Sequence, residues 1–166
     1  MNDSKSISKK QELTCARHEA GHAIEHVIQN LHFTKVTILP NIDGLGHVEY
    51  NLPNPKNISE SKKIEILKKL SIISVMGMIA EYIYTGKMNI QGSNADRIYI
   101  HGLYQQLGLS DKDSAILLAS ITAGQLQKYN ADKIYKYILD KVAKALFKNK
   151  SMTYKEVKDI IKANSK

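Results

Sequence analysis

The segment His18-Glu19-Ala20-Gly21-His22 has the residue types and spacing of a hydrolytic metal site. On a helix, side chains four residues apart share one face at about 5–6 Å between Cβ atoms, so His18 and His22 could bind one metal ion. Zinc lowers the pKa of a bound water to about 7, and a carboxylate at Glu19 could take its proton as it attacks a peptide carbonyl. Because so short a string also occurs by chance, its surroundings must decide.

The residues around this motif favour the helix that the geometry requires. Positions 11–30 contain no proline, and apolar side chains recur among them at helical spacing. The helix could start at Thr14 or at a capping residue near Ser8, and the sequence leaves both open. Gly21 costs about 1 kcal/mol relative to alanine inside a helix, so we infer that its bare backbone makes room for the metal site or for a neighbouring segment.

Length, charge and composition indicate one domain. The chain has 166 residues, 43% of them hydrophobic, and a formal net charge of +8. Only Arg17 and Arg97 are arginines, and the lysines are spread along the chain without interleaved aromatic residues, so we expect a solvated surface and no nucleic-acid partner. We expect positions 1–9 to be a flexible polar N-terminus and positions 10–166 to form the domain.

Cys15 is the single cysteine, which excludes an internal disulfide and suits a reducing compartment. It is either a small core residue or a group that approaches the metal. The first ten residues lack the apolar segment of a signal peptide, and the most apolar stretch, at 70–83, is too short and too often interrupted to span a bilayer. We therefore expect a cytoplasmic protein without a transmembrane segment.

Patterns beyond the motif predict a mainly helical (α+β) domain with one small β-hairpin or sheet. The β-rich segments 35–39 and 47–50 flank a turn-like segment at 40–46. Further helices are expected at about 59–85, 93–107, 110–129, 132–148 and 153–163.

A catalytic zinc site needs three protein ligands and one open position. His26 follows His22 by one turn, but about 12 Å of helix rise separates it from His18, which is too far for one ion. Glu25 is excluded on similar grounds, so the third ligand should come from another helix. The remaining polar candidates are expected to be ordinary surface residues: His47, His101 and Asp111.

Four blocks in the chain are arranged in an order that is more specific than the motif alone. They are HEAGHA at 18–23, VTILP at 36–40 with Leu45-Gly46, GMIAEYIYTG at 77–86, and GSNAD at 92–96. In order and spacing they resemble the peptidase domain of the FtsH family of AAA+ zinc metalloproteases, and the similarity runs from about Lys10 to Ala163. The resemblance implies a helical zincin-like metallopeptidase fold, a zinc cofactor and a polypeptide substrate.

The resemblance also implies roles for individual residues. Asp96 matches the aspartate that supplies the third zinc ligand, although Ser93-Asn94-Ala95-Asp96 also fits an S-x-x-D capping box. Glu81 matches a glutamate near the site that would support it by orienting a ligating histidine, with direct ligation of the metal as the rival role. The resemblance does not name a further oxyanion stabiliser; Tyr50 and Tyr99 are candidates for it from their residue type alone.

A strand near the site presents its edge to an extended peptide in that family, and backbone pairing of this kind binds with little sequence preference. The matching residues here are Gly46, His47, Val48, Glu49 and Tyr50. The alternative for this segment is a plain structural hairpin.

The chain departs from the full-length family proteins, because it has no G-x-x-x-x-G-K-[ST] phosphate loop, ATPase domain or membrane helix. We expect cleavage of peptides, unfolded chains or exposed loops, or dependence on a separate ATPase or delivery partner. The start at Met1 favours a free-standing relative over an excised domain. A narrow-target regulatory metalloprotease and a non-catalytic binding or assembly module are the alternatives, and the intact Glu19 argues against the second. A symmetric homo-oligomer and a monomer are both open.

Overall fold

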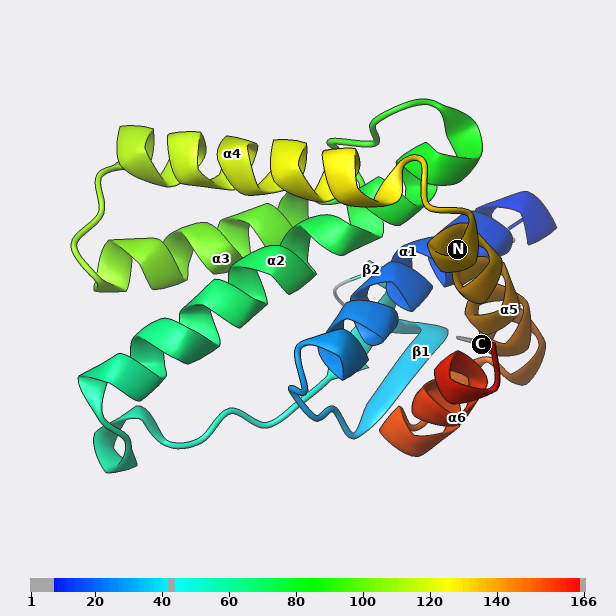
Figure 1. Cartoon of the computed structure of the whole chain (residues 1–166), viewed down its shortest axis with the longest axis horizontal. Coiled ribbons are helices and arrows are strands. Elements are labelled where there is room, and N and C mark those ends of the chain that lie inside the picture. Colours follow the sequence, from blue (N-terminus) through cyan, green and yellow to red (C-terminus); the bar gives the residue numbers. More distant parts are fainter. Residues whose placement is uncertain (1–7, 42–43, 165–166) are drawn as a thin grey trace, which may run out of the picture.

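The computed structural model describes residues 8–41 and 44–164. Within them, six α-helices and a three-stranded antiparallel sheet confirm the expected mainly helical fold with one small sheet (Figure 1). The elements are α1 (Lys9–Ile28), β1 (Lys35–Asn41), β2 (Gly44–Glu49), the 3₁₀ turn η1 (Pro55–Asn57), α2 (Glu60–Thr85), α3 (Asn94–Gln106), α4 (Asp111–Tyr129), α5 (Lys133–Asn149), β3 (Ser151–Met152) and α6 (Tyr154–Asn164).

Ser8 begins α1 through a capping box. The Gln11 backbone N–H donates to Ser8 Oγ at 3.2 Å, and the Ser8 N–H donates to Gln11 Oε1 at 2.9 Å. Thr14 lies inside the helix, where its hydroxyl donates to the Lys10 carbonyl at 3.0 Å. Of the two starts that the sequence left open, the structure has the one at Ser8. Residues 1–7 of the expected N-terminal segment lie outside the described residues.

α1 is the central helix of the fold and contacts α2, α5, α6 and the strands β1 and β2 (Figure 1). Small residues at its buried positions let these neighbours approach closely, and Ala16, Ala20 and Ala23 are all fully buried. A Cβ at Gly21 would collide with the Met76 carbonyl oxygen and lie 2.7 Å from Ala80 Cβ, both on α2. Of the two roles that the sequence left open for Gly21, the structure has the second: its bare backbone makes room for a neighbouring segment, which is α2.

α2, α3 and α4 lie on the same side of α1 (Figure 1). A small apolar cluster of Ile66 and Leu70 on α2 with Ile100 and Tyr104 on α3 joins two of them. The Tyr104 hydroxyl donates to Ser71 Oγ at 2.5 Å, which adds a buried polar contact between the same helices. These contacts hold α3 against α2, which itself packs on α1.

The sheet has the strand order β2-β1-β3, so β2 is an outer strand. β1 pairs with β2 through Val36↔Val48 and Thr37↔His47, and with β3 through Val36↔Met152. The strands extend further than the sequence indicated, to Asn41 and from Gly44, so the expected turn at 40–46 is shorter, and residues 42–43 lie outside the described part. The register is irregular between Thr37 and Pro40, as expected where proline lacks an N–H.

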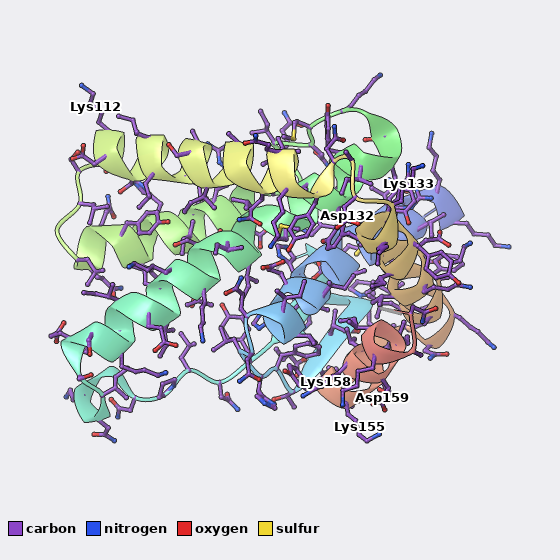
Figure 2. The ribbon with its side chains drawn as sticks, in the orientation of Figure 1. Lys112, Asp132, Lys133, Lys155, Lys158 and Asp159 are labelled. Atoms are coloured by element: carbon purple, nitrogen blue, oxygen red, sulfur yellow. The ribbon has the colours of Figure 1, made fainter. Side chains whose placement is uncertain are left out.

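The charged surface is well solvated. Lys112 extends from the free end of α4, and Lys155 and Asp159 project from α6 (Figure 2). Lys155 Nζ lies 2.6 Å from Asp159 Oδ2, a surface pair between adjacent turns.

None of the described helices is both long enough and apolar enough to cross a membrane.

Candidate active site

Three side chains converge where α1 meets the first turn of α3. His18 Nε2 and His22 Nε2 are 3.0 Å apart, and Asp96 Oδ2 lies 3.2 Å from the first and 3.4 Å from the second. Ligands bonded to a tetrahedral zinc ion at about 2.0–2.1 Å lie about 3.3 Å from one another. These three atoms thus have the spacing that one zinc ion requires.

Nδ1 of each histidine, the ring nitrogen that is not one of the three converging atoms, already has a hydrogen-bond partner. His18 Nδ1 lies 2.7 Å from Glu81 Oε1, and His22 Nδ1 donates to the Ile73 carbonyl at 2.7 Å. Each neutral ring donating from Nδ1 has its lone pair on Nε2. Two lone pairs and a carboxylate oxygen that face one another at about 3 Å repel, and a cation between them removes the repulsion. The chemistry of the donor set therefore fits a metal ion.

The charged groups around the three atoms also favour a positive charge at this place. Burial by itself would lower the pKa of His18, but hydrogen bonds to Asp96 and Glu81 outweigh it and raise that pKa to about 10. Burial would raise the pKa of Asp96, whereas His22 and His18 hold it well below its usual range. The site thus strongly favours positive charge beside Asp96, which a proton or a metal ion can supply.

Gly77 on α2 leaves the space that such an ion needs. A Cβ at this position would collide with Nε2 of His18 and with Nε2 of His22. Any side chain at Gly77 would therefore enter the space in front of both candidate ligand atoms.

Asp96 does not act as the reciprocal partner of a helix cap. Ser93 is the N-cap residue of α3, but its side chain makes no capping hydrogen bond, and its hydroxyl donates to the Asn89 carbonyl at 3.2 Å. The same S-x-x-D spacing at Ser110 behaves differently, because Ser110 Oγ accepts from the Asp113 N–H at 3.1 Å. The capping alternative for Asp96 is therefore not the conformation that the structure has.

Glu81 holds His18 in place and is not one of the three converging residues. While Oε1 contacts His18, Oε2 accepts a hydrogen bond from Asn89 Nδ2 at 2.9 Å. This geometry matches the role of orienting a histidine, and not the role of a metal ligand. Asn89 was not predicted, because nothing in the spacing of this polar loop residue marks it as a partner of α2.

Replacing Glu81 with glutamine is expected to weaken zinc binding about 10- to 100-fold, the usual effect of losing a carboxylate behind a ligating histidine. Competition for zinc with a chelating dye at fixed pH measures the change. Glu65→Gln is the matched control, because Glu65 lies on the same helix but pairs with surface lysines Lys62 and Lys69. Equal affinities in both variants would show that Glu81 does not support the site.

Glu19 is buried beside the three atoms, with 6% of its surface exposed. Burial raises the pKa of its carboxyl group, and positive charge on His18 and His22 opposes that rise. β2 passes close by, since a Cβ at Gly46 would lie 2.9 Å from Glu19 Oε1 and 2.6 Å from Cys15 Sγ. Gly46 has φ of 86°, a conformation that glycine adopts readily.

Two cavities meet at the site and make it a cleft. The first, of about 640 Å³, extends towards the start of α1, and the second, of about 350 Å³, lies towards α2 and the end of β2. Glu19, Gly46, Ala95 and Asp96 line both. Peptide-sized space therefore exists on either side of Glu19.

The predicted substrate strand lies along this cleft. Gly46, His47, Val48 and Tyr50 line the second cavity, although Tyr50 follows the last residue of β2. Glu49 does not face the cavity, and its carboxylate lies 3.0 Å from Lys35 Nζ. β2 pairs only with β1 in the part of the chain that the structure describes, so its outer side is that of an edge strand.

The weaker candidates lie apart from the three converging atoms. Cys15 Sγ donates to the Leu45 carbonyl at 3.0 Å, and burial raises the pKa of its thiol to about 12, so it is a protonated core residue. His101 lies 3.1 Å from Asp111, a pair between α3 and α4. His26 Nδ1 donates to the Leu31 carbonyl at 2.9 Å.

Fold and site together define a helical domain with a candidate His-His-Asp metal centre in a cleft. The model of Peptidase family M41 matches residues 5–166. The chain therefore belongs to Peptidase family M41.

Two curated relatives carry the same name. The chain is 34% identical over 92 residues to the ATP-dependent zinc metalloprotease FtsH of Lachnoclostridium phytofermentans, covering 54% of this chain and 15% of that protein. It is 35% identical over 118 residues to the ATP-dependent zinc metalloprotease FtsH of Haemophilus influenzae, covering 67% of this chain and 18% of that protein. The aligned part is thus a small share of either relative.

Proposed function

We propose that this domain is a zinc-dependent metalloendopeptidase that hydrolyses peptide bonds in unfolded or exposed polypeptide. His18, His22 and Asp96 hold the zinc ion, and Glu19 is the general base. The observation that carries the proposal is the mutual spacing of 3.0, 3.2 and 3.4 Å among the three candidate ligand atoms, directly beside a buried glutamate. Membership of a peptidase family supports the same reaction.

Zinc, when bound, acts as a Lewis acid that acidifies a water molecule and polarises the substrate carbonyl. Glu19 accepts the proton of the attacking water and then donates it to the leaving amide nitrogen. Its burial favours both steps, because a raised pKa makes the carboxylate a better base and its protonated form easier to reach. Glu81 and the Ile73 carbonyl keep the two histidines in the tautomer that leaves Nε2 free for the metal.

The substrate binds as an extended strand against the outer side of β2. Backbone N–H and C=O groups of an edge strand pair with any extended peptide, which gives binding with little dependence on side chains. Glycine at position 46 lets the backbone pass close to Glu19 at the junction of the two cavities. A peptide bond lying across that junction would be within reach of the general base.

An extended substrate implies a supply of unfolded chain. The 166 residues contain no phosphate-binding loop of the G-x-x-x-x-G-K-[ST] type. Cleavage of folded proteins would therefore depend on an ATPase provided elsewhere, as a further part of a longer protein or as a separate delivery partner. Peptides and unfolded proteins would need no such help.

Metal analysis and casein cleavage test the proposal together. We expect about one zinc ion per chain, cleavage of casein, loss of cleavage with 1,10-phenanthroline, and recovery when zinc is added back. A tightly folded protein incubated in parallel should stay intact. Zinc bound without cleavage of casein would favour a narrow-target or non-catalytic role, and failure to bind zinc at all would contradict the ligand assignment.

A further inference from the structure

The smaller cavity beside the candidate metal centre has the form of a side-chain pocket. Its volume of about 350 Å³ is at the low end of the range of roughly 300–1,000 Å³ for ligand sites. Much of its wall is apolar or aromatic: Val48, Tyr50, Leu70, Ile73 and Tyr99. Since Glu19, His22 and Asp96 also line it, a side chain bound here would belong to a residue close to the bond being cut.

His26 also lines this pocket and has one nitrogen without a partner. Its side chain is fully buried, and Nδ1 donates to the Leu31 carbonyl at 2.9 Å, which leaves Nε2 as an acceptor. Among the described residues, nothing donates to this Nε2. Buried polar atoms nearly always have a hydrogen-bond partner, so an unpartnered acceptor in a residue that lines a pocket points to a donor from a ligand.

The surroundings of His26 keep its ring neutral. Burial lowers the pKa of His26 to about 4, and the bond to the Leu31 carbonyl only partly opposes this. The Tyr50 ring lies 5.0 Å from the His26 ring, and the Tyr50 hydroxyl is engaged with Tyr99. Tyr50 therefore does not satisfy Nε2.

We propose that this pocket binds a tyrosine side chain of the polypeptide substrate and that His26 Nε2 accepts a hydrogen bond from its phenol hydroxyl. The proposal rests on the proposed peptidase function. Tyrosine fits because its flat apolar ring suits the walls and its donor lies at the far end of the ring. A lysine would bury a charged ammonium against a neutral acceptor, and serine is too short to reach past the walls.

Matched peptides that differ only by Tyr or Phe beside the scissile bond test the proposal. We expect wild-type kcat/KM to favour tyrosine by roughly two- to twelvefold, the range that one neutral hydrogen bond supplies. The ratio should fall to about one or below in His26→Leu, and His26→Gln, which retains an acceptor, should keep part of it. Because both peptides are cut by the same protein sample, the ratio is independent of any general loss of folded enzyme.

His101→Leu is the matched control, because His101 is a partly exposed histidine on α3 that lines neither cavity of the cleft. Its Tyr-to-Phe ratio should equal that of wild type. A wild-type ratio of about one, or an unchanged ratio in His26→Leu, would overturn the proposal while leaving the peptidase function intact.

Binding without turnover separates this proposal from the peptidase function. N-acetyl-tyrosinamide should shift the His26 side-chain nitrogen resonances of the zinc-loaded protein, and N-acetyl-phenylalaninamide should shift them less. If no peptide is cleaved but the tyrosine amide alone produces this shift, the result supports the tyrosine pocket and contradicts the proposed peptidase reaction. Equal shifts, or none from either amide, would contradict the pocket.

Discussion

Replacing Glu19 with glutamine is expected to lower kcat for peptide cleavage by about 10²–10⁴-fold, the usual contribution of a positioned general base. The amide has almost the same shape as the carboxylate but cannot take the proton of the attacking water. Zinc should stay at one ion per chain, because Glu19 is not among the three converging ligand atoms. Single-turnover cleavage of a fluorescent peptide and metal analysis of the same sample measure both effects.

The folded state should not suffer from this change. Burial raises the pKa of Glu19, so ionising that carboxyl group inside the protein is unfavourable and a neutral amide removes the cost. Glu12→Gln is the matched control on the same helix, since Glu12 pairs with Lys150 at 3.0 Å and lines neither cavity. Cleavage at the wild-type rate by Glu19→Gln would remove Glu19 from the mechanism, whatever the metal content.

Replacing Asp96 with alanine is expected to weaken zinc binding by more than about 100-fold, which exceeds the typical effect of losing a group behind a ligand. Only His18 and His22 would then remain of the three side chains, and a structural or catalytic zinc ion normally needs at least three protein ligands. Peptide cleavage should be lost together with the metal. Zinc competition titration and the casein assay follow the two losses.

A second S-x-x-D segment in this chain provides the control for Asp96. Ser110 Oγ donates to Asp113 Oδ2 at 2.6 Å and accepts from the Asp113 N–H, so this pair caps α4. Asp113→Ala should therefore cost stability, up to about 1 kcal/mol, and leave zinc in place. If Asp96→Ala behaved like Asp113→Ala, with zinc retained and a small loss of stability, the ligand assignment would be wrong.

The helices were predicted well because their signals are local. Ser59, Ser110 and Asp132 cap the starts of α2, α4 and α5, and Gly86 in the left-handed conformation ends α2. Each signal lies within one turn of the boundary that it sets. β3 was missed because two residues are too short to show a period, and its pairing partner Val36 lies far away in the sequence.

The strand lengths were underestimated for a related reason. Pro40 marks a turn in a local pattern, yet an irregular register between Thr37 and Pro40 lets β1 continue to Asn41. Whether a proline ends a strand depends on which side of that strand is paired, and sequence spacing does not carry this information.

For the candidate site, the sequence by itself determined what one helix can determine. The four-residue spacing places His18 and His22 on one face of α1. Glu19 follows His18 directly on the same helix, so its carboxylate lies near them. Family resemblance added Asp96 and Glu81 as expectations, and the match to the model of Peptidase family M41 established the family.

Tertiary structure decided which groups surround those residues. The packing of α2 on α1 and of α3 on α2 brings Asp96 within 3.4 Å of both histidines, places Glu81 behind His18, and leaves Gly77 bare in front of them. It also encloses His26 beside a pocket with one acceptor unsatisfied. These relations join residues from three helices, and their distances depend on how side chains pack, which local spacing in a sequence does not encode.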